Sequence, residues 1–379
     1  MMLSACQRFD SSVPNGWALE PIGKRIALEY GTGLTDTERT PGAFQVFGSN
    51  GPVGTHDKYL VEGPGILVGR KGSVGEVHFS EGNFWPIDTV YYVAQKANDD
   101  LRFVACLLEF LRLDTLNAAT GVPGLTRRDA LFMLGAFPPP AEQTRIAETL
   151  KAADDHIRAL EEHARKAERV FRALLSDLFN GLSAAPKVKG RQCFTLHGYV
   201  NFDDGVAFTP EGQTAYFKVD DFNSPGNERQ LVRAAARIAI DPGSKSVPFE
   251  VGNVIFAKRG AALTKNRVRI NAVPCFLDPN LMLMRPIPDV VEAAFLRYYL
   301  MRFRLEKLGE DAGIPQLNNK DLYPKEFPIP GQTVRDSICQ ALFAAEDLVD
   351  SVNAQLTAAR RVKQSLLQNL LTGKIRLKP

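Results

Sequence analysis

The sequence predicts an α+β protein in which two similar mixed domains are joined by two long helices. The main observation is an internal repeat: Gly121–Leu125, followed by Asp129, returns as Gly313–Leu317, followed by Asp321. The offset is 321 − 129 = 192 residues. Each copy also has the same order, a strand-rich segment, a proline-rich stop and a long helical stretch. A repeat of this size predicts two similar domains related by a pseudo-twofold axis.

Length and composition set broad limits on the fold and its partners. The 379 residues are enough for two or three domains that each bury a core. A net charge of +3 does not by itself indicate a nucleic-acid partner. The five cysteines show no CxxC spacing, which argues against a disulfide framework and a zinc site. No apolar run approaches the roughly 18 residues of a membrane span, so we expect a cytoplasmic protein that does not enter a membrane.

The first copy is expected to begin after a leader at residues 1–16. Residues 17–140 are predicted to form mainly strands, because segments such as Gly65–Gly69 and Asp88–Val93 are apolar, β-branched or aromatic and are bounded by glycine or turn residues. A helix is expected at about Phe103–Thr115 from its apolar spacing.

The first long helix follows the prolines at 138–140 and occupies the segment 141–182. It is predicted to end at Asn180, with Gly181 in the position of a C-terminal cap. At 1.5 Å per residue it would be a rod of roughly 55–60 Å. A helix of this length that is charged on its other faces normally needs a partner helix.

The second copy supplies that partner. A linker at 183–191 is expected to lead into a second domain at 192–330, with a helix near Phe295–Leu305, and 331–379 then form the second long helix and a C-terminal tail. The two rods should pack antiparallel as a coiled-coil spacer. Val170, Leu348 and Val362 also fall in the apolar stripes. The predicted seam residues are Ile146, Leu150, Ile157, Leu160, Leu174, Leu178, Ile338, Leu342, Val349, Val352, Leu356, Leu366 and Leu370.

Several motifs resemble a known family. The run Pro-Pro-Pro-Ala-Glu-Gln-Thr-Arg-Ile-Ala at 138–147 is similar to the conserved-region motif of Type I restriction–modification specificity subunits. The Gly-Val-Pro-Gly-Leu-Thr-Arg segment at 121–127, the Leu-Leu-Thr-Gly-Lys-Ile segment at 370–375 and the opening at Gly16-Trp17 share this resemblance. The second copy departs from the pattern at 331–338, where Gly-Gln-Thr-Val-Arg-Asp-Ser-Ile stands.

The resemblance implies a DNA-reading role without chemistry of its own. The segments 17–140 and 192–330 would be target-recognition domains that read the two halves of a bipartite, asymmetric DNA site. The helices would be a spacer and a docking post for two methyltransferase subunits and the restriction motor subunits. S-adenosylmethionine, ATP and magnesium would then belong to those partners, and this chain would bind no cofactor.

Catalytic motifs that would contradict this role are missing from the sequence. There is no GxxxxGK[ST] phosphate loop, no FxGxG methyl-donor loop and no HExxH zinc motif. His156 and His163 lie seven apart on the first long helix, a spacing we interpret as surface or seam rather than metal binding. We therefore expect a protein that is not an enzyme.

Two basic turns are the main candidates for contact with DNA. Arg70 and Lys71 follow an apolar strand and precede a glycine, and Lys258 and Arg259 do the same in the second copy. Cations at such loop tips can hold phosphates, and arginine can also bind guanine O6 and N7 with two hydrogen bonds. A solubilising turn is the alternative.

Weaker candidates lie in other polar segments, each with a structural alternative. Asn50 lies in a polar loop and could present its amide to adenine, or could simply belong to an Asn-Gly turn. Lys265, Asn266 and Arg267 form a basic cluster that could contact phosphate. The last set occupies matching places after the repeated turns and either contacts the DNA backbone or caps a helix; it comprises Arg127, Arg128, Asn319 and Lys320.

Two further expectations concern partners. The exposed faces near Glu142–Glu148 and Lys374–Lys378 are where methyltransferase subunits would dock. The alternative function is a structural scaffold that bridges protein subunits without reading DNA.

Overall fold

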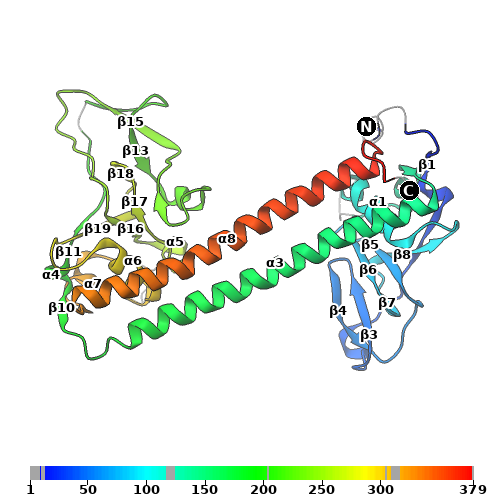
Figure 1. Ribbon diagram of the computed structural model, residues 1–379, viewed down its shortest axis with the longest axis horizontal. Coiled ribbons are helices and arrows are strands. Elements are labelled where there is room, and N and C mark those ends of the chain that lie inside the picture. Colours follow the sequence, from blue (N-terminus) through cyan, green and yellow to red (C-terminus); the bar gives the residue numbers. More distant parts are fainter. Residues whose placement is uncertain are drawn as a thin grey trace. The chain divides into compact units, whose positions relative to one another are not determined.

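The computed structural model describes residues 9, 13–116, 124–202, 205–303, 305–308 and 316–377. Helices and strands are both present, so the predicted α+β class is confirmed. The chain divides into two compact units, which are Met1–Glu162 with Asn353–Pro379 (unit 1) and His163–Val352 (unit 2). Both long helices, α3 (Pro140–Asn180) and α8 (Gln332–Leu371), contribute residues to both units (Figure 1).

Unit 1 contains two main sheets and a short strand pair. The larger sheet is antiparallel, with the order β2 (Ile26–Tyr30), β8 (Val90–Gln95), β5 (Gly65–Gly69) and β6 (Val77–Ser80). The smaller sheet has the order β4 (Gly51–His56), β3 (Phe44–Gly48) and β7 (Phe84–Pro86), and β1 (Ala18–Pro21) pairs with β9 (Leu134–Phe137). Helix α1 (Leu101–Leu111) lies against β5 and β6, and the short α2 (Arg127–Phe132) precedes β9.

Unit 2 repeats this arrangement. Its larger sheet has the order β11 (Phe194–His197), β19 (Leu281–Pro286), β16 (Val254–Ala257), β17 (Val268–Asn271) and β14 (Gln230–Leu231). The other sheet has the order β12 (Val206–Phe208), β15 (Ala236–Ile240), β13 (Thr214–Phe217) and β18 (Cys275–Leu277), and β10 (Lys187–Lys189) pairs with β20 (Glu326–Pro328). The helices are α4 (Gly190–Cys193), α5 (Gly260–Thr264), α6 (Ala293–Arg302) and α7 (Asn319–Leu322).

The two units share a strand topology even where their sequences match poorly. In each, the larger sheet joins four antiparallel strands in the same order, and the smaller sheet contains one parallel pair, β3 with β7 and β13 with β18. Strands β12 and β14 of unit 2 have no counterpart among the described residues of unit 1. The duplication therefore extends through both sheets of each unit.

A polar contact fixes the start of each long helix. The Gln143 amide donates to the Pro138 carbonyl and to Asp99, and its oxygen accepts from the Asp100 backbone at the start of α1. In unit 2, Arg335 donates to the Pro330 carbonyl. It also forms an ion pair with Glu292, at the start of α6, through two hydrogen bonds. All three pairs of equivalent positions keep the 192-residue offset (335 − 143, 330 − 138 and 292 − 100). The start of each long helix is thus held at equivalent positions, by an amide in unit 1 and by an ion pair in unit 2.

The predicted seam residues are all buried or half-buried. Ile146, Leu150 and Leu370 belong to the core of unit 1, and Ile338 and Leu342 belong to that of unit 2, so the ends of the long helices pack on the globular sheets as well as on a helix. For three further residues of the predicted apolar stripes, the prediction of burial is wrong, because they are more than half exposed; these are Val170, Leu348 and Val362.

Two local expectations are corrected, for the linker and for Glu142. The segment predicted as a linker contains β10 and the start of α4, because Val188 pairs with Phe327 of β20. Gly181 directly follows the last residue of α3, Asn180, as predicted, and it is not left-handed, whereas its equivalent Gly373 is, at φ 71°. Glu142, expected on an exposed face, is buried, because the C-terminal Arg376 folds back onto it.

Within the described part of the chain, no helix is both long enough and apolar enough to cross a membrane.

Candidate nucleic-acid interface

The basic turn of unit 1 follows the fully buried strand β5. After Gly69 the chain turns through Arg70 and Lys71 to Gly72, which has φ 77°, a conformation that favours glycine. The backbone N–H groups of Arg70 and Lys71 both donate to the Thr89 carbonyl. The apolar strand thus anchors the turn, while the Lys71 side chain is exposed and that of Arg70 is half-buried.

An aromatic ring gathers two of the candidate arginines. The Arg70 and Arg127 guanidinium carbons lie 5.2 and 5.3 Å from the centre of the Tyr30 ring, within the range of a cation–π contact. The Tyr30 ring also packs on that of Tyr91, with 5.1 Å between the ring centres. Burial raises the pKa of the Tyr91 hydroxyl, which donates to the Leu125 carbonyl at 3.1 Å. The structure therefore brings together residues that are 97 positions apart (127 − 30).

Each basic turn joins the repeated turn that follows the Gly-x-Pro motif. Gly121, Pro123 and their equivalents Gly313 and Pro315 lie outside the described residues, but the next residues are present. Lys71 forms a β-bridge with Gly124, and Arg259 forms the same bridge with Gln316. The Leu125 N–H donates to the Arg70 carbonyl at 2.9 Å, and the Leu317 N–H donates to the Lys258 carbonyl at 2.7 Å.

The basic turn of unit 2 has the same backbone conformation as that of unit 1 but carries different side chains at its surface. Gly260 has φ 67°, as the equivalent of Gly72. Burial, together with the charge of Arg259, holds the pKa of the Lys258 ammonium below its usual value, while Asp278 acts in the opposite direction. Arg259 is exposed and immediately precedes α5.

The four residues after the Gly-x-Pro turns all begin helices. Thr126 accepts a hydrogen bond from the Asp129 N–H, and Asn318 caps α7 together with Asp321. The helix-capping alternative is thus confirmed for the residues that precede each pair. Arg127 and Arg128 open α2, and Asn319 and Lys320 open α7; all four are exposed.

Asn50 is the exposed second residue of a tight hairpin between β3 and β4. Gly48 pairs with Gly51, which has φ 99°, so the Asn-Gly turn alternative describes its backbone. The preceding Ser49 carbonyl lies 3.2 Å from the His78 ring and would meet a side chain at Gly69. The hairpin tip therefore packs beside the basic turn of unit 1.

The third predicted cluster does not form one surface. The Asn266 amide donates to the carbonyls of Leu300, Met301 and Phe303, so it holds the end of α6 and is not available to DNA. Its φ of 47° is a conformation that asparagine tolerates. Arg267 donates to Asn223, whereas Lys265 is exposed at the end of α5. Only Lys265 of this cluster has its side chain directed to solvent without a described partner.

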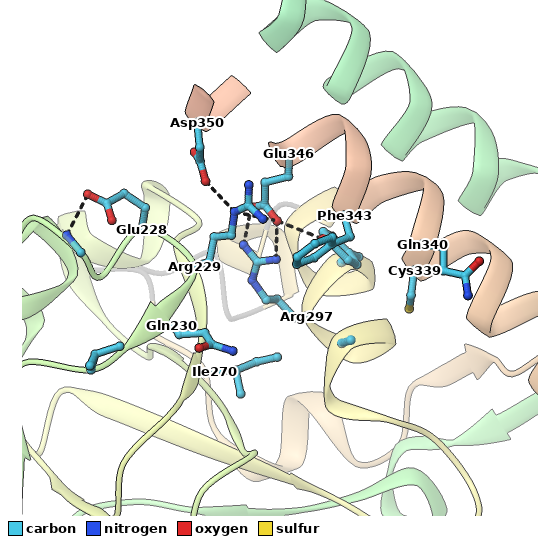
Figure 2. A pocket seen from close by; sticks show the side chains of 14 residues that line it. Glu228, Arg229, Gln230, Ile270, Arg297, Cys339, Gln340, Phe343, Glu346 and Asp350 are labelled. Carbon is cyan, nitrogen blue, oxygen red and sulfur yellow. Dashed lines mark hydrogen bonds and ion pairs between the residues drawn. The ribbon is translucent and has the colours of Figure 1, made fainter. Parts of the chain in front are cut away.

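A groove in unit 2 was not anticipated from the sequence. It has a volume of about 740 Å³ and is lined by α6, α8 and the segment around Arg229. Figure 2 shows Arg297 and Arg229 converging on Glu346 of α8. Arg297 forms two hydrogen bonds to Glu346, at 2.9 and 2.5 Å, and the Tyr298 hydroxyl donates a third. Arg229 also pairs with Asp347 and Asp350 of α8, so both arginines have acidic partners and the cluster is suited to holding α8 rather than to chemistry.

Among the described residues, no group of three His, Cys, Asp or Glu side chains is placed to hold a metal ion.

Comparison with known proteins finds a domain and a relative that are similar to part of the chain. A model of the Type I restriction modification DNA specificity domain matches residues 30–168. Over 92 residues, the chain is 31% identical to a Methanocaldococcus jannaschii protein named as the specificity subunit of the type I restriction enzyme MjaX. This alignment covers 24% of the chain and 22% of that relative, so the chain matches less than a quarter of the relative's length.

Solved structures share the fold over almost the whole chain. The crystal structure of the Type-I restriction-modification system S subunit from M. genitalium superposes with a TM-score of 0.66 at 17% identity, covering 96% of this chain and 97% of that one. A chain from a structure on complex assembly and conformational transition of the type I R-M system gives a TM-score of 0.59 at 16% identity, with coverages of 97% and 100%. Residues 30–168 are thus similar to a Type I restriction modification DNA specificity domain, and the solved S subunit shares its fold with almost the whole chain.

Proposed function

We propose that this chain is the DNA sequence-recognition subunit of a Type I restriction–modification complex, and that each unit reads one half of a bipartite, asymmetric site. The observation that carries the proposal is the repeated meeting of a basic turn with the turn after the Gly-x-Pro motif. Double-stranded DNA needs cations against its phosphates and planar donors at its base edges. The turns of both units offer these groups on a rigid backbone.

The asymmetry of the site would come from the side chains on this shared backbone. Arg70 stands where unit 2 has Lys258, and Lys71 stands where it has Arg259. Arginine can form paired bonds to a guanine edge, whereas lysine acts as a point charge. Equivalent turns with different cations would therefore favour different half-sites.

The long helices are proposed to act as spacer and docking post. α3 and α8 would pack as an antiparallel coiled coil that sets the gap between half-sites, and two methyltransferase subunits and the restriction motor subunits would assemble on this frame. The relative from the structure on complex assembly of a type I system supports this role. In this proposal the chain itself performs no catalysis, and S-adenosylmethionine, ATP and magnesium are bound by its partners.

Methylation mapping tests the DNA-reading role. A host expressing the chain with its methyltransferase should acquire adenine methylation at one bipartite sequence. Arg70→Ala should lower methylation by about tenfold or more, or relax the sequence, in one half-site only, and Arg259→Ala should do so in the other. Lys24→Ala in unit 1 and Arg191→Ala in unit 2 are exposed cations outside the turns and serve as controls.

The scaffold alternative gives a different result. If Arg70→Ala combined with Arg259→Ala leaves salt-sensitive DNA binding of the assembled complex unchanged, the basic turns do not read DNA. A host whose methylation pattern does not depend on this chain would reject the proposed function altogether.

A further inference from the structure

We infer that Tyr30 is a positioning residue for DNA recognition in unit 1. Its ring would orient Arg70 and Arg127 as a pair toward paired acceptor atoms of the DNA, and the equivalent place in unit 2 is taken by Gly198. This inference rests on the proposed function of the basic turns. It adds a residue that contributes to specificity through the arginines beside it.

Tyr30 is placed at the end of strand β2, directly beside the basic turn. It pairs with Tyr91 of β8, and Tyr91 pairs in turn with Val68 of β5, two residues before Arg70. Tyr30 is 52% exposed, the Arg127 side chain is 45% exposed and Arg70 is half-buried, so part of this cluster is open to solvent. The ring therefore lies at the surface on which the basic turn ends.

Each of the two guanidinium groups is held by a backbone carbonyl group on one side only. Arg70 donates from Nε and Nη2 to the Asp88 carbonyl at 3.0 and 2.7 Å. Arg127 donates from Nη1 to the Leu28 carbonyl at 3.3 Å and lies 3.7 Å from the Glu29 carboxylate. Among the described residues, Nη1 of Arg70 and Nη2 of Arg127 have no acceptor. These N–H groups remain available for a ligand.

The chemistry of this arrangement favours a ligand with two adjacent acceptors. A guanidinium stacked on an aromatic ring keeps its plane and loses less entropy when it forms paired hydrogen bonds. Guanine O6 with N7, and two oxygens of one phosphate, both present such pairs. Tyr30 would thus prepare Arg70 and Arg127 for DNA before contact is made.

Unit 2 lacks this ring at the equivalent position. Strand β11 pairs with β19 so that the residue after His197, Gly198, comes opposite Met282. Met282 pairs with Phe256, two residues before Lys258. By this register Gly198 corresponds to Tyr30. A Cβ atom on Gly198 would lie 3.7 Å from the Lys258 ammonium. The Lys258 ammonium therefore lies beside a residue that has no side chain.

The consequence is a chemical difference between the two half-sites. Unit 1 would contact its half-site through planar, preoriented arginines. Unit 2 would contact its half-site through Lys258, which meets no aromatic ring among the described residues, and through the exposed Arg259. Because the two contacts differ, each half-site would be read by only one of the two units. The orientation of the chain on the DNA would then be fixed.

The test compares Tyr30→Leu with Tyr30→Phe in the full chain assembled with its methyltransferase. Both are used to select sequences from a random duplex library, and affinity is then measured over a range of salt concentrations. Tyr30→Leu should bind about tenfold more weakly, with the loss confined to the half-site read by unit 1, whereas Tyr30→Phe keeps the ring and should stay close to the wild type. Tyr59→Leu is the matched control, because Tyr59 is 46% exposed and packs on Phe44 rather than on an arginine.

The outcomes separate the inference from the proposed function. A relaxed base position in one half-site supports contact with a guanine edge, and a uniform loss with a smaller salt slope supports contact with phosphate. Equal behaviour of Tyr30→Leu and Tyr30→Phe, or an equal loss in both half-sites, would overturn the inference. A wild-type chain that selects no bipartite sequence would instead overturn the proposed function. If Tyr30→Leu lowers the unfolding temperature, Tyr30→Gln is used and judged by the same criteria.

Discussion

Glu142 connects three segments of unit 1 that are far apart in the chain. Its carboxylate forms two hydrogen bonds with Arg376, at 2.8 and 2.7 Å, and accepts others from the Trp17 indole and the Leu377 backbone. The Arg376 guanidinium also lies 5.4 Å from the Trp17 ring centre. The side chain of Glu142 is only 4% exposed, so the start of α3 is covered by the C-terminal tail and is not a free docking face.

We expect Glu142→Gln to lower the free energy of unfolding of unit 1 by about 2 kcal/mol, because the substitution leaves Arg376 without its charge partner. The hydrogen bonds from Arg376 hold the pKa of Glu142 below its ordinary value of 4.5. The stabilisation is therefore complete above pH 4.5 and is lost as pH falls through the lower folded pKa. Urea unfolding at pH 7 and at acid pH should show the difference between wild type and variant shrinking at acid pH.

Asp155→Asn provides the control for charge removal. Asp155 pairs with Lys151 and Arg158 on the exposed face of α3, and its side chain is 44% exposed. Such pairs contribute about 0–1 kcal/mol. A loss at Asp155 as large as that at Glu142 would contradict the role assigned to the buried carboxylate.

Two glycines separated by 192 residues should respond differently to alanine. Gly373 has φ 71°, and a methyl group on it would overlap Pro14. Gly373→Ala should therefore destabilise the protein by about 2 kcal/mol. Gly181 continues the helical geometry, and a methyl group there would meet carbonyl oxygens at 3.5 Å, an ordinary contact.

Gly181→Ala is accordingly expected to change stability by no more than about 0.5–1 kcal/mol, in the stabilising direction. Thermal unfolding of the two single variants is the measurement. Similar midpoints would show that the left-handed turn at Gly373 is not required.

At the level of elements, equivalent positions on the two long helices carry an acid that pairs with a cation from a different element in each unit. Glu346 of α8 pairs with Arg297 of α6, whereas the equivalent Asp154 of α3 pairs with Lys363 of α8 at 2.8 Å (346 − 154 = 192). Although burial opposes it, Arg297 holds the pKa of Glu346 below the ordinary value. The same position on each helix thus carries an acid, while the cation comes from α6 in unit 2 and from α8 in unit 1.

Glu346→Ala should lower the free energy of unfolding of unit 2 by about 3 kcal/mol, because Arg297 would stay buried without its main partner. Replacing both residues, as Arg297→Met with Glu346→Leu, should restore most of this loss. Glu161→Ala removes a partner of Arg360 on an exposed face and should cost less than about 1 kcal/mol. Equal losses in the Glu346 and Glu161 variants, measured by urea unfolding, would show that burial of the pair has no effect.

At the level of the whole molecule, the proposed spacer makes a quantitative prediction. Inserting four residues at Ala153 and four at Ala345 lengthens each helix by about 6 Å. DNA rises about 3.4 Å per base pair, so the methylated sequence should gain a gap of about two base pairs with both half-sites unchanged. Methylation mapping of the insertion variant gives the answer directly.

Insertion of four residues at Lys245 is the control, because this segment belongs to neither long helix. It should leave the gap as it is in the wild type. An unchanged gap in the Ala153 and Ala345 variant would reject the idea that the helices set the distance between half-sites.

The sequence alone determined the α+β class, the repeat, the two long helices and the resemblance to Type I specificity subunits. These features depend on residues that are neighbours in the chain or on a copied segment, so periodicity and motif comparison are enough to find them. The basic turns were found in the same way, because an apolar strand followed by two cations and a glycine is a local pattern. Their repetition at Arg70 and Lys258 is matched by equal backbone bonds in both units.

Only the tertiary structure decided which polar residues face solvent and which hold the fold. Glu142 meets partners 125 and 234 positions away, and Tyr30 meets Arg127 after 97 positions, distances over which no local pattern operates. Asn266 was expected at the DNA surface because its neighbours are basic, yet its left-handed backbone turns the amide toward the end of α6. Burial of a polar side chain depends on the packing of several segments at once, and that packing is set by the folded chain as a whole.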